Sequence, residues 1–350
     1  MNTEEIEVQE TEYGNWRKFE IDEDETIVVE AGYKPFNELL EEEFIELENL
    51  QNSECFPGIS TGFESLDKVM AGLKKNDLVV IGGQPASGKT ALALSIMLNV
   101  AVDHHLPVLY ISLESSALEL SKRIIRMRSG ISNEKLYGIS KLEPSEWMQL
   151  ESKMKGVENA PIFIEERPNL TIGHIRNIVR TQIEKNGIRL VIIDYIQLIK
   201  GRVDNRINRE QEMSSISREL KSLAKECQVP IVAISSLSRQ LSNRQNTHSN
   251  SRPQISDLRD SGSIEFEADV ILLLYPQICF GLSDDDFDRD RMTLIIAKNR
   301  DGECCDIDLK YDWRELRISE FEEGFGLYGS RISSESAMNV EDFDESNSPF

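Results

Sequence analysis

The chain has 350 residues, 39% of them hydrophobic and 29% charged, with a formal net charge of −23. This length suits one large α/β domain with appendages. The charge is uneven, because residues 1–50 hold 17 acidic and 3 basic residues and residues 321–350 hold 7 and 1. Residues 51–320 keep 38 acidic and 35 basic residues. The centre is therefore nearly neutral and can carry a basic surface, while both ends are acidic arms.

Several protein classes are excluded by composition. The five cysteines form no CxxC pair and no cluster with histidine at zinc spacing, which argues against a disulfide framework or a structural metal. The first residues lack the basic and apolar regions of a signal peptide, and no apolar run reaches about 18 residues. We expect a cytoplasmic protein with no membrane segment.

The domain boundaries follow from changes in residue pattern. Residues 1–35 are acidic and poor in hydrophobic residues, which favours a disordered arm over the alternative of one weak hairpin. Residues 36–52 show apolar side chains at steps of three and four, the pattern of an amphipathic linker helix. That helix packs either on its own domain or on a neighbouring subunit. Residues 53–320 are expected to form the globular domain, and residues 321–350 an acidic, disordered tail.

The most informative stretch is DLVVIGGQPASGKT, residues 77–90, which fits the G-x-x-x-x-G-K-[ST] phosphate-binding loop at every fixed position. An apolar strand over 77–81 and an apolar helix over 91–102 provide the context that this loop requires. Backbone N–H groups would approach phosphate oxygens, the lysine would supply a positive charge, and the threonine would hold Mg²⁺. The expected nucleotide-binding residues are Gly83, Gln84, Pro85, Ala86, Ser87, Gly88, Lys89 and Thr90.

After this loop, apolar strands alternate with amphipathic helices, which predicts an α/β fold with a mainly parallel sheet flanked by helices. The last two strands are expected to form a C-terminal β-hairpin around Asp301 and Gly302. Strands are expected over 107–113, 162–164, 190–194, 231–235, 269–275, 292–297 and 305–311, and helices over 117–128, 171–185 and 209–227.

Two of these strands lead into carboxylates. Because ligands bind beyond the carboxyl ends of parallel strands, Glu114 and Asp194 are expected beside the phosphate loop. Asp194 would hold the Mg²⁺ shell, and Glu114 would orient and deprotonate the attacking water. The alternative for each is a turn former or helix cap.

Six blocks of this sequence resemble, in order, the motifs of the RecA-like P-loop ATPase domain of DnaB-type replicative helicases. The resemblance covers about residues 36–320, and the third and fifth blocks separate the chain from RecA, RadA and KaiC relatives. The blocks are GISTGFESLDKVMAGLKKNDLVVIGGQPASGKT (58–90), ISLES (111–115), VIIDYIQLI (191–199), NREQEMSSISRELKSLAKECQVPIVAIS (208–235), SDLRDSGSIEFEADVILLLY (256–275) and IIAKNRDG (295–302).

The resemblance implies an ATP- and Mg²⁺-dependent helicase that forms a homo-hexamer and moves 5′ to 3′ on single-stranded DNA. It implies that Lys298 and Arg300 act in trans on the nucleotide of a neighbouring subunit; the alternative is a solvated strand end. The residues implied to contact the DNA backbone, unless they are merely solvated, are Arg209, Arg259, Asp260 and Gly262.

Three departures from the family leave other functions open. The helical N-terminal domain that engages primase is absent, Ser236 stands where the family has a glutamine sensor, and Asp260 replaces a glutamate. The alternatives are a nucleotide-gated clamp or loader for single-stranded DNA, or a RecA/RadA/KaiC-like ATPase. The C-terminal run from Val340 to Phe350 resembles the tip of bacterial single-stranded DNA-binding proteins and predicts docking to a replication partner; the alternative is a solvating tail.

Overall fold

The computed structural model describes residues 8–11, 14–20, 26–30, 35–51, 56–201, 209–238, 252–258, 261–276 and 290–320. The chain divides into two units, Met1–Cys55 and Phe56–Phe350. Within the described residues, no helix is long and apolar enough to cross a membrane.

The first unit contains a small antiparallel sheet and one helix. Strands β1 (Val8–Thr11), β2 (Gly14–Glu20) and β3 (Thr26–Glu30) pair in that order. This differs from the disordered arm expected for residues 1–35. The run TIVVE in β3 is rich in β-branched residues, which favour an extended backbone. Helix α1 spans Phe36–Gln51, as its apolar periodicity predicts.

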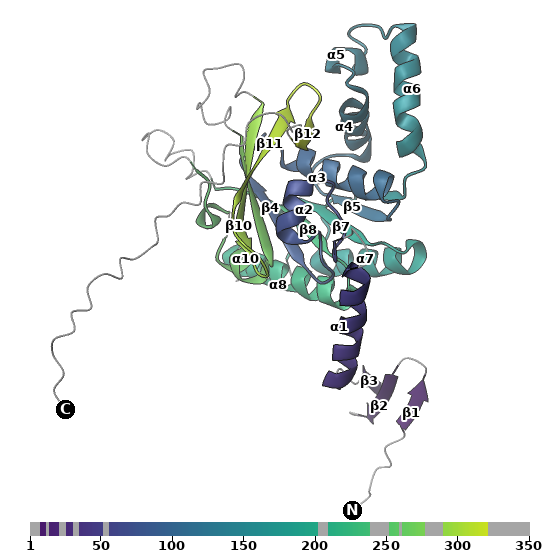
Figure 1. Ribbon diagram of the computed structural model, residues 1–350, viewed down its shortest axis with the longest axis vertical. Helices are drawn as coiled ribbons and strands as arrows, with labels where there is room; N and C mark the ends of the chain where they lie inside the picture. Colours follow the sequence, from purple (N-terminus) through teal and green to yellow (C-terminus); the bar gives the residue numbers. More distant parts are fainter. Residues whose placement is uncertain are drawn as a thin grey trace, which may run out of the picture. The chain divides into compact units, whose positions relative to one another are not determined.

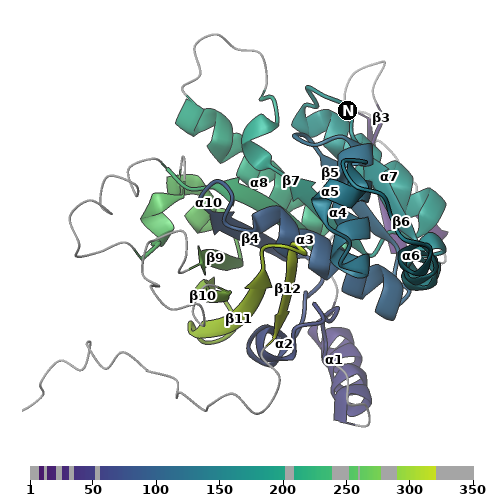
Figure 2. The same cartoon turned by 90° about the horizontal axis from the view of Figure 1, so that it is seen from above.

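Nine of the described strands of the second unit form one sheet, whose ribbon is drawn in Figure 1. Their order is β12-β11-β10-β9-β4-β8-β7-β5-β6. The six from β9 to β6 are parallel, and β10, β11 and β12 continue the sheet as an antiparallel ladder (Figure 2). The strands are β4 (Leu78–Gly83), β5 (Val108–Ser112), β6 (Ile162–Glu165), β7 (Leu190–Asp194), β8 (Ile231–Ser236), β9 (Val270–Pro276), β10 (Arg291–Asn299), β11 (Asp306–Asp312) and β12 (Arg317–Glu320).

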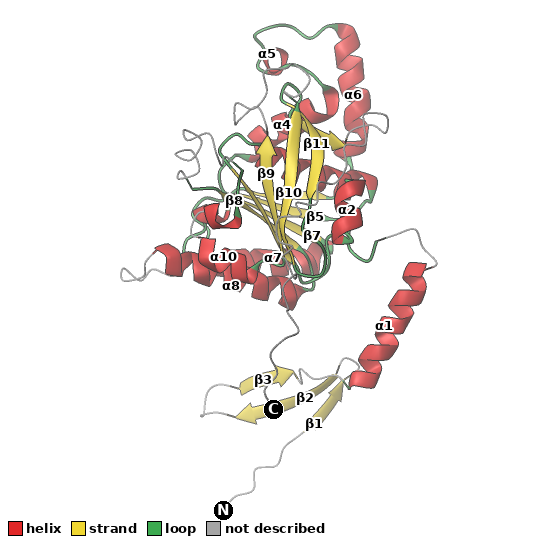
Figure 3. Ribbon diagram, turned by 60° about the vertical axis from the view of Figure 1, so that its left-hand side comes forward, coloured by secondary structure: helices red, strands yellow, loops and turns green. Residues whose placement is uncertain are grey.

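Helices cover both faces of this sheet, and alternate residues of each parallel strand serve the two faces. In β4, Val79 and Ile81 pack with α2, α3 and α4, whereas Leu78 and Val80 pack with α7, α8 and α10. Figure 3 shows helices on both faces of the sheet. The helices are α2 (Glu64–Met70), α3 (Lys89–Leu98), α4 (Ala117–Ser129), α5 (Asn133–Leu136), α6 (Pro144–Glu158), α7 (Ile172–Asn186), α8 (Arg209–Cys227) and α10 (Ser261–Glu267), with a π-helical turn η1 (Asn99–Asp103) and 3-10 turns η2 (Ile196–Leu198) and η3 (Ile255–Asp257). Burial on both faces explains why these strands are nearly continuous apolar runs.

The predicted fold class is confirmed: the sheet is mainly parallel, and β10 and β11 form the expected hairpin. Sequence analysis did not anticipate β12 or α2. Strand β12 is short and partly polar, so its pairing with β11 decides its conformation. In α2, buried Asp67 accepts hydrogen bonds from Ser60 Oγ at 2.6 Å and from the backbone N of Thr61 at 2.9 Å, which fixes the turn before the helix.

Candidate nucleotide-binding site

The phosphate-binding loop connects β4 to α3, and its glycines are required by close contacts. A Cβ on Gly83 would lie 2.3 Å from Ser87 Oγ, which is nearer than packed atoms approach. Gly88 has φ +95°, a left-handed conformation, and a Cβ there would meet the Tyr311 ring at 3.1 Å. Glycine is therefore favoured at both positions by space, and at Gly88 also by backbone conformation.

Lys89 begins α3 and points back over the loop. Its Nζ donates to the carbonyl oxygens of Gly83 at 2.9 Å and Gln84 at 2.6 Å. Burial lowers the pKa of Lys89 to about 8, although the negative charges of Asp194 and Glu114 oppose this effect. A desolvated ammonium group beside backbone carbonyls gains strongly from a phosphate oxygen, which carries a full negative charge.

Thr90 and Asp194 meet as the sequence predicts. Thr90 Oγ1 donates to Asp194 Oδ2 at 2.8 Å, and the Tyr110 hydroxyl donates to the same oxygen at 2.8 Å. Tyr110 is fully buried, and burial together with the Asp194 charge raises its pKa well above the usual value. Tyr110 therefore stays protonated and holds the carboxylate in place. Hydroxyl and carboxylate oxygens are the donor types that Mg²⁺ prefers, so this pair fits the ion.

Two further atoms of the loop fit phosphate. Ser87 Oγ and Gln84 Nε2 are buried and have no hydrogen-bond partner among the described residues. A buried donor without an acceptor is costly, and a phosphate oxygen would supply that acceptor. These two atoms support the interpretation of the loop as a phosphate cradle.

The loop opens into a cleft of about 1570 Å³ at the carboxyl ends of the parallel strands. Glu114 follows β5, Asp194 ends β7 and Ser236 ends β8, and all three line the cleft. Strands far apart in sequence therefore bring the predicted carboxylates to the phosphate loop, as the rule for parallel sheets requires.

An aromatic pair forms another part of the cleft wall. The rings of Tyr311 and Trp313 lie with centroids 4.1 Å apart, and Gly88 packs on Tyr311. Neither these two residues nor Tyr110 was predicted from the sequence. Tyr110 had a detectable signal, because a tyrosine inside a buried aliphatic strand needs a partner for its hydroxyl. Tyr311 had none, since its position over the loop depends on the register of β11.

The sequence profile of the family described as DnaB-like helicase C terminal domain matches residues 58–322. The chain belongs to this family. Its membership agrees with the phosphate loop, the carboxylates at the strand ends and the mixed sheet described above, and it implies nucleotide binding.

Relatives and solved structures place the chain among DnaB-like proteins. It is 39% identical over 286 residues to a probable replicative DNA helicase of Trieres chinensis, covering 81% of this chain and 62% of the relative. It is 37% identical over 273 residues to the replicative DNA helicase DnaB of Geobacillus stearothermophilus, covering 78% and 59%. The chain thus spans about three-fifths of the length of these relatives.

The fold comparison gives the same result. One solved structure, of an isolated ATPase domain, superposes with a TM-score of 0.75 at 30% identity, covering 83% of this chain and all of that domain. A DnaB-like replicative helicase, in a structure that concerns its interactions with primase, superposes with a TM-score of 0.73 at 30% identity. That match covers 84% of this chain and 68% of the other.

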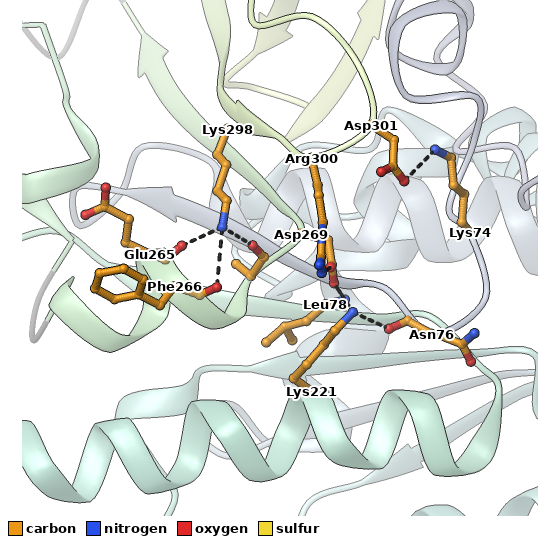
Figure 4. A network of polar contacts seen from close by, with 11 residues as sticks. Lys74, Asn76, Leu78, Lys221, Glu265, Phe266, Asp269, Lys298, Arg300 and Asp301 are labelled. Atoms are coloured by element: carbon orange, nitrogen blue, oxygen red, sulfur yellow. Dashed lines mark hydrogen bonds and ion pairs between the residues drawn. The ribbon is translucent and has the colours of Figure 1, made fainter. Parts of the chain in front are cut away.

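Lys298 and Arg300 lie outside the cleft, at the end of β10, and both contact their own chain (Figure 4). Lys298 Nζ donates to the carbonyl oxygens of Glu265 and Ala268, each at 2.6 Å, at the C-terminal end of α10. Arg300 Nη1 donates to Asp269 Oδ1 at 3.2 Å. The structure therefore places the two cations side by side but not on this chain's own phosphate loop.

Asp269 is the centre of that cluster. Its Oδ2 accepts from the backbone N of Leu78 at 2.8 Å and from Lys221 Nζ. Burial opposes ionisation, but these hydrogen bonds and the Lys221 charge hold the pKa of Asp269 below its usual value. The pKa of neighbouring Asp77 is raised to about 6, mainly by burial and, to a smaller extent, by repulsion from the Asp269 charge.

The residues expected to contact DNA are only partly described. Arg209 begins α8, and Gly262 lies exposed in the first turn of α10. Helices α8 and α10 pack against each other, which brings these two positions to neighbouring elements. Arg259 and Asp260 lie outside the described residues.

Proposed function

We propose that the chain is the motor of a ring-forming, ATP-dependent DNA helicase that moves 5′ to 3′ on single-stranded DNA during replication. The observation that carries this proposal is the cleft in which Lys89, Thr90, Glu114 and Asp194 converge. Membership of the DnaB-like family and the replicative helicases among its relatives support it.

Within one subunit, we infer that the phosphate loop binds the ATP phosphates and that Thr90 and Asp194 hold Mg²⁺. The ion would neutralise phosphate charge. Lys89 would exchange its contacts with backbone carbonyls for a phosphate oxygen. Glu114 would orient the attacking water and take its proton, the role of the water-positioning residue in phosphoryl transfer.

We propose that Lys298 and Arg300 complete the site of a neighbouring subunit in a homo-hexamer. The Arg300 side chain is 65% exposed, so it can reach beyond its own chain despite its contact with Asp269. Helix α1 supports assembly, because its apolar residues are exposed within the first unit, including Phe36 at 73% and Phe44 at 66%. An apolar helical face of this kind is suited to packing on another subunit.

We propose that Arg209, Arg259, Asp260 and Gly262 contact the phosphate backbone of single-stranded DNA. Such contacts carry no base information, so binding should be independent of sequence and should weaken with salt. Arg259→Ala should lower DNA-stimulated ATP hydrolysis and leave basal turnover nearly unchanged. An equal loss of both rates would give Arg259 a structural role.

The deciding experiment is strand displacement on a forked DNA substrate with ATP and Mg²⁺. The proposal expects unwinding by the wild-type protein and none by Glu114→Gln. ATP turnover and DNA binding without unwinding would favour a nucleotide-gated clamp or loader, the second candidate that Ser236 suggests.

Three further expectations stay predictions. The cytoplasmic location is predicted from the amino-acid composition alone. Docking of a replication partner by residues 340–350 concerns a segment outside the described residues; deletion of Phe350 should abolish binding of that peptide and leave DNA-stimulated ATPase unchanged. The DnaB-like replicative helicase of known structure interacts with primase, and a binding assay with primase would test the same interaction for this chain.

A further inference from the structure

One side chain, Gln197, connects the end of β8 to the start of α8. It lies in the 3-10 turn η2, directly after the strand that ends at Asp194. Its Nε2 donates to Ser235 Oγ at 2.8 Å, and its Oε1 accepts from the backbone N of Ser236 at 3.3 Å. Ser236 in turn lines the nucleotide cleft. The side-chain amide of Gln197 is therefore hydrogen-bonded to the end of β8 that lines the nucleotide cleft.

The backbone carbonyl of Gln197 contacts the start of α8. The Gln197 carbonyl oxygen accepts from Arg209 Nη2 at 2.7 Å. The guanidinium of Arg209 also contacts Glu212, and Glu212 Oε1 accepts from the backbone N of Gly201 at 2.7 Å. Arg209 is thus positioned by the segment that Gln197 ties to β8.

The amide is not needed to fill the core. Ile196 and Ile199 supply the buried apolar side chains of this turn, each with 1% of its surface exposed, whereas Gln197 is half-buried. A glutamine is suited to the observed contacts because its side chain offers a donor and an acceptor at once. An apolar residue of the same length would keep the packing and lose both hydrogen bonds.

We propose that Gln197 is a positioning residue that couples phosphate occupancy at the Ser236 end of the cleft to the presentation of Arg209 to a DNA backbone phosphate. This inference rests on the proposed function and assigns its coupling to one residue. A displacement of the β8 end by a phosphate moves Gln197, and Gln197 carries the carbonyl that orients Arg209. The contacts form one continuous physical path, which a coupling measurement can test.

The experiment measures the affinity of the full chain for a fluorescent oligothymidylate by anisotropy, with Mg²⁺ and either no nucleotide or a non-hydrolysable ATP analogue. In the wild-type protein, the analogue should change the dissociation constant by about 5–150-fold, the usual range of coupling between two sites. Gln197→Met keeps the side-chain length and removes both hydrogen bonds. It should bring the ratio of the two constants to within about twofold of unity.

The matched control is Gln182→Met. Gln182 lies in α7, and its side chain accepts a hydrogen bond from Asn186 away from the cleft. In Gln182→Met, the ratio of the dissociation constants without and with the nucleotide analogue should equal that of the wild-type protein. Gln197→Leu provides a second variant in case Gln197→Met does not fold, and thermal melting identifies folded preparations. Basal ATPase of folded Gln197 variants should stay within about twofold of wild type.

Three results would overturn the inference. A wild-type ratio retained in folded Gln197→Met would show that Gln197 does not couple the sites, while leaving the proposed helicase function intact. Parallel losses of basal ATPase and DNA affinity with an unchanged ratio would give Gln197 a purely structural role. A wild-type protein that binds no DNA would overturn both the inference and the proposed function.

Discussion

The cationic side chains in the nucleotide cleft and at the end of β10 differ in the groups that they contact. In the cleft, Lys89 Nζ donates to carbonyls of its own loop, and buried donors of that loop have no partner among the described residues. At β10, Lys298 and Arg300 are already engaged by α10 and Asp269. One chain therefore provides a phosphate site ready for its ligand, whereas the proposed trans-acting pair must first leave contacts in its own chain.

The cost of leaving differs between the two cations. The ion pair of Arg300 is largely exposed on the arginine side, and such pairs contribute about 0.2–1 kcal/mol. Lys298 donates to carbonyls of Glu265 and Ala268, and hydrogen bonds to a charged group contribute about 1.5–3 kcal/mol each. A trans arginine that accelerates hydrolysis by about 10³–10⁵ lowers the barrier by about 4–7 kcal/mol. Arg300 is accordingly the cation that can be released more easily.

The largest effect is expected from Arg300→Ala. Removing a trans-acting guanidinium should lower kcat for ATP by about 10³–10⁵, with nucleotide affinity changed only a few-fold. Steady-state ATPase and equilibrium nucleotide binding measure the two quantities. The matched control is Arg291→Ala, because Arg291 begins β10, the strand that Arg300 directly follows, and pairs with Asp308. Comparable losses in both variants would point to a disturbed β10 and contradict action on phosphate.

Glu114→Gln tests the half of the site that one chain provides. Loss of a general base should reduce kcat by about 10²–10⁴ while ATP still binds. Glu119→Gln is the control, because the Glu119 carboxylate accepts from the backbone N of Ser116 at 2.9 Å and caps α4. If Glu114→Gln retained near wild-type turnover, another group would have to activate the water.

Lys89 predicts a pH dependence of nucleotide binding. Its pKa of about 8 in the free protein must rise when phosphate binds, since phosphate favours the ammonium form. Below pH 8, Lys89 is protonated and should cause no pH dependence of the affinity for an ATP analogue. Above pH 8, that affinity should fall by up to about tenfold per pH unit. Titration calorimetry from pH 7 to 9.5 measures this. In Lys89→Arg the guanidinium stays charged, so the decline should vanish; an unchanged decline would exclude Lys89 as its source.

The smallest effect is expected at Asp77, beside the Asp269 cluster. Its pKa of about 6 lies above the unfolded value, so the folded state binds the extra proton and its stability falls as pH rises from about 4 to 6. Asp77→Asn should therefore stabilise the protein at pH 7, by about 1 kcal/mol after allowance for the partial exposure of the side chain. Denaturant unfolding at pH 7 and pH 4 should show this gain shrinking at the lower pH. A gain equal at both values would contradict the assignment.

The same two regions show how far sequence reasoning reaches. The phosphate loop is a local pattern, and parallel topology brings Glu114 and Asp194 to it, so the cleft could be predicted before its geometry was known. The predicted ends of β7 and α8 agree with the structure for a similar reason: strong apolar runs and periodicity define them.

The contacts that sequence did not reveal depend on register between distant strands. Tyr311 reaches Gly88 only because β11 extends the sheet past β10, and Asp269 reaches Lys221 only because α8 packs on β4, with which β9 pairs. Gln197 lay inside a quoted block, but its two-sided hydrogen bonding requires the positions of β8 and α8. Residue type alone does not determine such pairings.

The most direct test of the composite site mixes two inactive variants, Arg300→Ala and Glu114→Gln, and measures ATPase across mixing ratios after co-assembly is demonstrated by native mass spectrometry. If Arg300 acts on the nucleotide of a neighbour, some interfaces in a mixed ring contain neither substitution, and activity should exceed that of either variant alone. We expect this partial rescue, with a maximum at intermediate ratios. Mixed rings that remain as inactive as the separate variants would contradict action in trans.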